Sequence, residues 1–140
     1  MNTYLITGRD IEIADWAFTT FNFHPTQFCM AVGVATKDAG LVGACLFHAH
    51  NGPDVELSYY GPNTLTLGLV KRLAQIAVER LGVSRITART SRANKVMTRG
   101  IKKIGFEYEG IRKCGYGSQD AVMYGLYGKN LAKLAGKAMH

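Results

Sequence analysis

Apolar residues recur along the chain at two different spacings, and the changes of spacing predict alternating strands and helices. Short apolar runs bounded by Gly, Pro, Asn or Asp predict strands, whereas apolar positions three and four residues apart predict helices. The expected strands are 4–6, 28–36, 41–50, 55–59, 84–90, 106–113 and 121–128. The expected helices are 10–21, a segment from about 63 to 81, and 94–104, and the Ala- and Lys-rich tail from Lys129 could form a short helix.

Turn-forming residues mark the ends of these elements. Asp10 can cap the first helix, and residues 22–27, which contain Pro25, break it. Asn63 or Thr64 can cap the second helix, which Gly82 closes. Residues 37–40 and 115–118 are expected to be hairpin turns.

The resulting order, β-α-β-β-β-α-β-α-β-β, predicts an α+β domain, in which helices pack on a mixed sheet. A chain of 140 residues is one domain by its length, here 1–140, with no internal repeat or linker. It can bury roughly two-thirds of its unfolded surface. An apolar content of 47% and a charged content of 19% predict a folded, soluble protein.

The absence of a visible signal peptide and the pattern of the cysteines predict a reducing compartment. No signal peptide precedes the first strand and no apolar run approaches the ~18 residues of a membrane span, which predicts a cytoplasmic protein. Three cysteines without CxxC spacing favour neither disulfides nor a zinc site. Cys29 and Cys45 lie in apolar runs and are expected to be buried, whereas Cys114 in a glycine-rich turn lacks a catalytic partner.

The net charge of +7 favours an anionic partner, which could be a phosphate-bearing cofactor, an acidic protein or nucleic acid. Much of it lies on the third helix, where Arg92, Lys95, Arg99, Lys102 and Lys103 have no acidic neighbour. This helix, 92–103, is either a solvated surface or a site for an acidic partner. Because no aromatic residues alternate with these charges, nucleic acid is disfavoured.

One segment has a family resemblance. Asn94 opens the third helix, Gly105-Phe106 follow eleven and twelve positions later, and Glu109-Gly110 come soon afterwards. This pattern, together with the strand-helix-strand unit before it, resembles the acetyl-coenzyme A binding half of the GNAT N-acetyltransferases over 55–127. Asp120 and the sequence 106–112 resemble the ribosomal-protein N-acetyltransferase branch, and phages encode short proteins of this kind, which would place the protein in a host cytoplasm.

The resemblance implies a GNAT-like fold, a central, mostly antiparallel sheet of about seven strands flanked by helices. It also implies acetyl-CoA as co-substrate. Main-chain groups of Leu57, Ser58 and Tyr59 would hold the pantetheine arm, and Asn94 would contact the cofactor unless it is merely a polar residue at a helix start. The other cofactor-binding residues that it implies are Asn63, Thr64, Gly68, Lys71, Arg72, Arg92 and Met97.

The expected phosphate loop departs from the family pattern. Residues 60–68 retain only Gly68 at a position expected for a motif glycine, and Pro62 removes one N–H donor. Main-chain amides at a helix start bind phosphate without a particular side chain, and Lys71 and Arg72 could assist.

Acetyl transfer needs a base for the amine and an acid for the thiolate. The resemblance assigns the base to Glu56, which could otherwise be a surface carboxylate on an alternating strand. Many relatives place a Tyr seven positions after the helix Asn, where this chain has Ile101. Tyr59, Tyr116 or solvent could protonate the thiolate instead.

No metal site is expected. His48 and His50 fall on one face of a strand, but no Asp, Glu or Cys lies at ligand spacing, so a partly exposed strand end is the better interpretation.

Two functions remain open. The leading hypothesis is an N-acetyltransferase that transfers an acetyl group from acetyl-CoA to a protein N-terminus, a lysine or a small-molecule amine, by direct attack in a ternary complex. The alternative is a catalytically inactive GNAT-fold protein with a macromolecular partner, motivated by the altered loop, Ile101 and the basic helix. The final hairpin could pair two subunits into a homodimer.

Overall fold

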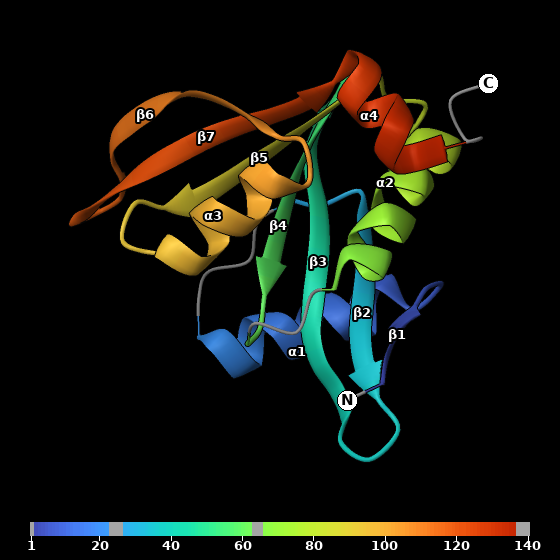
Figure 1. Ribbon diagram of the computed structural model, residues 1–140. Coiled ribbons are helices and arrows are strands. Elements are labelled where there is room, and N and C mark those ends of the chain that lie inside the picture. The colour runs from blue at the N-terminus through green and yellow to red at the C-terminus, as the bar shows by residue number, and fades with distance from the viewer. Residues whose placement is uncertain (1, 23–26, 63–65, 137–140) are drawn as a thin grey trace.

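The computed structural model describes residues 2–22, 27–62 and 66–136, which form seven strands and four helices (Figure 1). The order of elements is the predicted one, with the tail helix present. The elements are β1 Thr3–Ile6, α1 Asp10–Phe21, β2 Met30–Thr36, β3 Gly40–Asn51, β4 Asp54–Tyr60, α2 Leu67–Leu81, β5 Arg85–Ser91, α3 Lys95–Lys103, β6 Glu107–Tyr116, β7 Gln119–Tyr127 and α4 Gly128–Ala135.

All seven strands belong to one mixed, mostly antiparallel sheet, as predicted. Its spatial order is β1-β2-β3-β4-β5-β7-β6. The β4–β5 pair is parallel and the other neighbouring pairs are antiparallel. The parallel pair requires a crossover connection, and α2 provides it.

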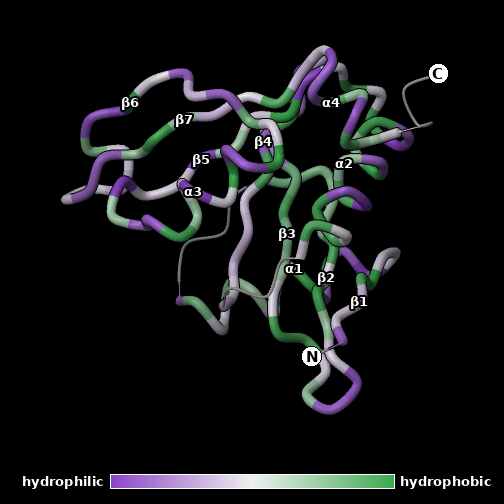
Figure 2. Tube along the Cα trace, viewed as in Figure 1, coloured by the Kyte–Doolittle hydropathy of each residue, from purple (hydrophilic) through white to green (hydrophobic). Residues whose placement is uncertain are grey.

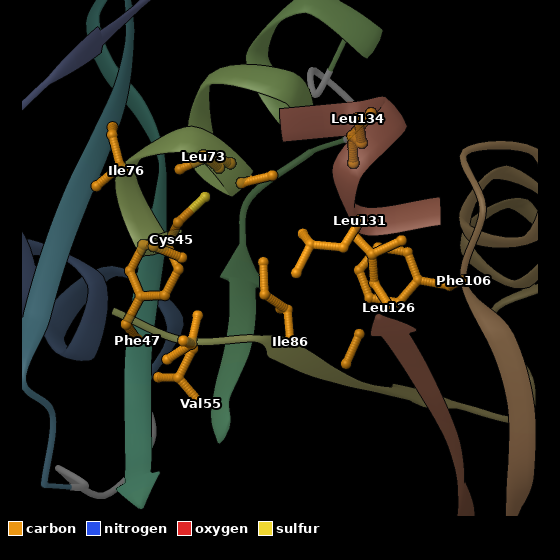
Figure 3. Close-up of a cluster of buried hydrophobic side chains, with 14 of the residues drawn as sticks. Cys45, Phe47, Val55, Leu73, Ile76, Ile86, Phe106, Leu126, Leu131 and Leu134 are labelled. Atoms are coloured by element: carbon orange, nitrogen blue, oxygen red, sulfur yellow. The ribbon is translucent and has the colours of Figure 1, made fainter. Parts of the chain in front are cut away.

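Helices cover both faces of the sheet, and each face has its own apolar cluster. Figure 1 shows α2 and α4 on the near side and α1 on the far side. On the near side, called here the α2 face, strand residues such as Phe47, Val55 and Ile86 pack with residues of α2 and α4 (Figure 3). On the far side, the α1 face, Ile13 and Ala17 pack on β2 and β3. The two clusters alternate along the strands, as the pleat requires.

The sheet forks between β4 and β5. Their ladder runs from Asp54 opposite Arg85 to Leu57 opposite Ala88, whereas the two strands continue to Tyr60 and Ser91. In Figure 1 the arrowheads of β4 and β5 point in different directions. β3 remains paired with β4, and β7 with β5, to the ends of the fork. The fork is therefore an opening in a sheet that is otherwise continuous from edge to edge.

The third helix is shorter and less buried than its apolar stripe predicts. α3 begins at Lys95, and Ile101 is its buried residue, whereas Val96 is 59% exposed. Figure 2 shows hydrophilic segments along α3 and β6, in contrast to the hydrophobic central strands β2 and β3. The apolar side of α3 is thus only partly packed against the core of the described residues.

Two local predictions need correction or limits. α2 begins at Leu67, where Thr66 is the N-cap, and the predicted caps Asn63 and Thr64 lie outside the described residues. Cys45 is buried as expected, but Cys29 is exposed because it precedes β2. Gly82 does close α2, in the left-handed conformation with φ of 65°. None of the described helices is long and apolar enough to cross a membrane.

Candidate functional site

A cleft of about 370 Å³ opens at the fork between β4 and β5. Its floor comes from the two strands and its walls from the start of α2, from α3 and from the end of the β6–β7 hairpin. The lining residues are Leu57, Tyr59, Tyr60, Thr66, Leu67, Val70, Ala88, Arg89, Thr90, Ser91, Asn94, Val96, Met97, Gly100, Ile101, Ile104, Phe106 and Tyr116.

The cleft reaches from one face of the sheet to the other. Leu57 and Ala88 belong to the cluster of the α2 face, and Tyr60 packs against that of the α1 face. Successive strand residues point to opposite faces, so Arg89, the residue after Ala88, is also directed to the α1 face. A ligand in the fork would therefore have one end on each face.

The part of the cleft on the α2 face is apolar. Val70, Met97 and Ile101 line it, and the two large apolar side chains at its rim, Leu67 and Val96, are 58% and 59% exposed. Apolar side chains that line a concave surface favour a ligand with an apolar part. The uncovered stripe of α3 is explained by this cleft.

Asn94 has a capping role and also lines the cleft. It is the N-cap of α3, and its side-chain oxygen accepts a hydrogen bond of 3.1 Å from the N–H of Met97. The other end of its amide, the NH₂ group, is not used by the cap. Both interpretations of Asn94 from the sequence are therefore compatible with its position.

The start of α2 lies at the same cleft. The Thr66 hydroxyl accepts a hydrogen bond of 3.2 Å from the N–H of Leu69, and its carbonyl accepts one from the N–H of Val70. No described residue accepts from the N–H groups of Leu67 and Gly68, which are both exposed. These amides and the positive end of the helix dipole favour an anion.

Three lysines surround a second hollow of about 320 Å³ beside the cleft. Lys71 of α2, Lys103 of α3 and Lys133 of α4 line it, and it shares Leu67 and Ile104 with the cleft. None of the three lysines forms an ion pair with a described residue. The helix packing therefore concentrates positive charge next to the start of α2.

Glu56 lies on the α1 face beside the fork, in a polar chain that also contains His48 and Ser58. The Oε2 atom of Glu56 lies 3.5 Å from Nδ1 of His48, and Nε2 of His48 lies 2.7 Å from Oγ of Ser58. The side chains of Glu56 and His48 are each 16% exposed. Burial lowers the pKa of His48 below its ordinary value, Glu56 opposes this shift and Arg89 adds to it.

The chemistry of Glu56, His48 and Ser58 restricts where the protons of this cluster can lie. A lowered pKa keeps His48 neutral near pH 7, so one ring nitrogen carries a proton and the other accepts one. In the tautomer with the proton on Nδ1, the ring N–H faces the Glu56 carboxylate 3.5 Å away, and Nε2 accepts from the Ser58 hydroxyl. Glu56 therefore has a neutral imidazole, and not a cation, as its close neighbour beside the fork.

Tyr59 lies in the cleft with a fixed ring. Its hydroxyl donates to the carbonyl oxygen of Pro62 at 2.9 Å. The ring covers Gly43 of β3 so closely that a Cβ at that glycine would lie 2.5 Å from the hydroxyl oxygen. Tyr59 is therefore tied to Pro62, just after the end of β4.

Two cleft residues on the α1 face, Tyr60 and Arg89, were not assigned from the sequence, and they lie near Tyr116, which was a candidate proton donor. Burial raises the pKa of Tyr60 and of Tyr116 and lowers that of His48, and the charge of Arg89 lowers the pKa of each. The Arg89 guanidinium therefore lies near all three side chains. The pairing of Leu57 with Ala88 could have revealed Arg89, because it places residue 89 at the fork.

The remaining candidate residues lie elsewhere. Arg72 interacts with Gln75 and Glu79 on α2, and Arg92 forms an ion pair of 3.5 Å with Asp120. His50 bonds to the carbonyl of Gly52 and is separated from His48 by a β-bulge at Ala49, where φ is 51°. No group of three metal-ligating side chains occurs among the described residues.

The structure thus gathers a subset of the predicted site residues. Leu57, Tyr59, Asn94 and Met97 line the cleft, Glu56 and Ser58 flank it on the α1 face, and Gly68 lies at the start of α2. Lys71 points into the neighbouring hollow. Arg72 and Arg92 have protein partners and do not line the cleft.

Comparison with solved structures identifies the fold. A dodecameric spermidine N-acetyltransferase from Vibrio cholerae superposes with a TM-score of 0.75 at 11% identity, over 96% of this chain and 97% of that one. A GCN5-related N-acetyltransferase from Brucella melitensis gives a TM-score of 0.67 at 13% identity, over 97% and 80%. The chain covers 64% of another, longer acetyltransferase-like protein, with a TM-score of 0.65 at 15% identity. At these identities the similarity establishes a GNAT-like fold.

Sequence comparisons add no closer relative, since neither the protein-family models nor the curated proteins searched match the chain.

Proposed function

We propose that this protein is an acetyl-CoA-dependent N-acetyltransferase that acetylates an amine. The observation that carries the proposal is the cleft that crosses the sheet at the β4–β5 fork. It has an apolar part on the α2 face and a polar part with Glu56 on the α1 face. Such a passage lets an acyl donor and an acceptor meet in the fork from opposite faces of the sheet.

The residues present suit an acyl-CoA molecule. The apolar walls around Met97 and Ile101 fit a pantetheine arm, and the N–H groups of Leu67 and Gly68 face where phosphates could bind. Lys71, Lys103 and Lys133 add the positive charge that a glycine-rich loop would not supply by itself. The altered loop in residues 60–68 is therefore compatible with phosphate binding.

Acetyl-CoA supplies, when bound, an acetyl group activated as a thioester. The amine nitrogen of the acceptor attacks the thioester carbonyl, forming a C–N bond as the C–S bond breaks. Glu56 removes the proton that the nitrogen must lose, and the proton is finally needed by the departing thiolate. His48 lies 3.5 Å from Glu56, and as a neutral ring it does not neutralise the carboxylate.

The main chain of β4 provides the second contribution. Where the ladder with β5 ends, the strand edge between Leu57 and Tyr60 borders the cleft. N–H groups at this edge can polarise the thioester carbonyl, and fixed donors stabilise developing charge without reorganisation. Tyr59 or Tyr116, both in the cleft, is positioned to return a proton to the thiolate.

A binding protein without catalysis is the second candidate function. α3 carries Arg99 and Lys102, which are exposed and have no ion-pair partner among the described residues. This basic surface favours an acidic macromolecule. The ribosomal-protein branch, a phage source, a cytoplasmic location and a homodimer remain predictions from the sequence.

The test is acetyl transfer by the purified chain to a panel of amines, measured as thiol release and as acetylated product. Glu56→Gln should lower kcat by about 10²–10⁴-fold, the range for a general base. Glu79→Gln, on the exposed side of α2, is the matched control and should leave kcat unchanged. An unchanged kcat in Glu56→Gln would remove Glu56 from the mechanism, and no product with any amine would favour the binding protein.

A further inference from the structure

Arg89 is an arginine with a buried polar group that has no partner. Its Nε atom is buried and makes no hydrogen bond in the structure. No carboxylate of the described residues forms an ion pair with its guanidinium. Yet the side chain lines the cleft at the fork.

The neighbouring arginine on the same face of β5 shows what is missing. Arg85 forms ion pairs with Asp54 and Glu109, and its guanidinium lies 5.6 Å from the centre of the Tyr127 ring. Four residues further along, Arg89 has the same orientation in the strand, near His48, Tyr60 and Tyr116, but no described carboxylate lies within ion-pair distance of it. Among the described residues, therefore, Arg85 forms ion pairs and Arg89 forms none.

An arginine without a counter-charge in a partly buried cleft is costly, because its charge and its donors lose water without gaining partners. A ligand of opposite charge that accepts from these donors would remove this cost. A guanidinium presents a planar pair of donors that matches a carboxylate in a bidentate arrangement. The chemistry at this position therefore favours a carboxylate.

The position of Arg89 indicates which ligand bears that carboxylate. Glu56 and Arg89 lie on adjacent strands and on the same face, with Glu56 opposite Thr87. Strand spacing and rise place their Cα atoms roughly 8 Å apart. A small molecule whose amine meets Glu56 and whose carboxylate meets Arg89 can bridge this distance between the two side chains.

We propose that the acceptor is an amine that also carries a carboxylate, such as a free amino acid, and that Arg89 binds this carboxylate. The inference rests on the proposed acetyltransferase function and specifies its substrate class. Arg89 acts on affinity and orientation. The neutral amine attacks the acetyl thioester, the C–N bond forms as the C–S bond breaks, and CoA leaves as a thiolate. The nitrogen's proton goes to Glu56, the thiolate is protonated from Tyr59, Tyr116 or solvent, and the carboxylate is unchanged.

The experiment compares amino acids with their amides as acceptors. Each pair has the same amine and side chain, and the amide lacks the negative charge. Initial rates with saturating acetyl-CoA give kcat and KM, and calorimetry gives the affinity of the protein–CoA complex for N-acetyl amino acids and their amides. A diamine and a phosphate-bearing amine complete the panel.

The proposal predicts at least a tenfold lower KM for an amino acid than for its amide. Arg89→Gln should abolish this difference in KM and leave the Kd for acetyl-CoA unchanged. Arg89→Lys retains the positive charge but not the planar pair of donors, so it should retain part of the difference in KM. Arg85→Gln is the matched control on the same strand and should retain the preference for the acid. Thermal unfolding of each variant checks its folding.

The outcomes separate this inference from the function on which it rests. Suppose that acetyl-CoA binds and that the enzyme uses amides, the diamine or the phosphate-bearing amine as well as it uses amino acids. The carboxylate proposal is then overturned and the acetyltransferase function is retained. An equal loss for acids and amides in Arg89→Gln, or no binding of any carboxylate to the CoA complex, also overturns it. If acetyl-CoA itself does not bind, the proposed function fails first.

Discussion

Replacing Asn94 separates its two roles, the cap of α3 and a contact to the cofactor. The cap is a hydrogen bond of 3.1 Å from the N–H of Met97 to the Asn94 side chain. α3 has nine residues and buries Ile101 alone among its residues, so tertiary packing contributes little to hold its first turn. Losing an N-cap costs about 1 kcal/mol. With an unfolding entropy of about 2.1 cal/mol/K per residue over 140 residues, Asn94→Ala should lower Tm by about 3 °C.

The discriminating variant is Asn94→Ser, because serine caps a helix as well as asparagine does but has no NH₂ group. Its Tm without ligand should stay close to that of the unchanged protein. If the amide of Asn94 contacts the cofactor, calorimetric titration with acetyl-CoA should show an affinity several-fold weaker, consistent with one lost hydrogen bond of about 1 kcal/mol.

Two results would refute this reasoning. A Tm of Asn94→Ala equal to that of the unchanged protein would show that the cap does not stabilise α3. An affinity of Asn94→Ser equal to that of the unchanged protein would show that Asn94 is a cap alone, with no role in the cofactor site.

Three further predictions concern packing, pH and thiols. Gly43→Ala should destabilise the protein by about 1–3 kcal/mol in denaturant unfolding, because its Cβ would lie 2.8 Å from Cε1 of Tyr59, whose hydroxyl is tethered at Pro62; an unchanged midpoint would contradict the close packing. Because burial lowers the pKa of His48, protonation of this residue favours the unfolded chain. The contribution of neutral His48 to the free energy of unfolding should therefore be complete above about pH 6.5 and fall below it. His48→Gln should show a smaller fall in the free energy of unfolding between pH 6.5 and 5, and an equal fall would assign the effect to other groups. Burial raises the pKa of Cys45, so a thiol reagent should modify exposed Cys114 in the folded protein and Cys45 after unfolding; labelling of Cys45 at the same rate would contradict its burial.

Local patterns in the sequence were sufficient to predict the elements. The 3.6-residue period of α2 and the left-handed Gly82 predict where that helix ends, and the alternation in β4 predicts which residues share a face. These features depend on neighbouring residues. The exact start of α2 at Leu67 was not predicted, because Asn63, Thr64 and Thr66 are all acceptable caps and the choice depends on tertiary context.

The site was less predictable because its residues meet through strand register and helix packing. Glu56 and Asn94 were found through a family resemblance, whereas His48 joins Glu56 because β3 and β4 place them opposite one another. Lys71, Lys103 and Lys133 meet at one hollow only because the fold brings α2, α3 and α4 around it. Likewise, the missing partner of Arg89 is a property of all its surroundings, which no single segment of the sequence contains.

The central claim is that the cleft at the β4–β5 fork binds acetyl-CoA, and calorimetric titration of the purified protein tests it most directly. Binding in the micromolar range, weakened by salt because Lys71, Lys103 and Lys133 face the phosphates, is the predicted result. No heat of binding and no rise in Tm up to millimolar acetyl-CoA would show that a GNAT-like fold is present here without its co-substrate, and would contradict the account.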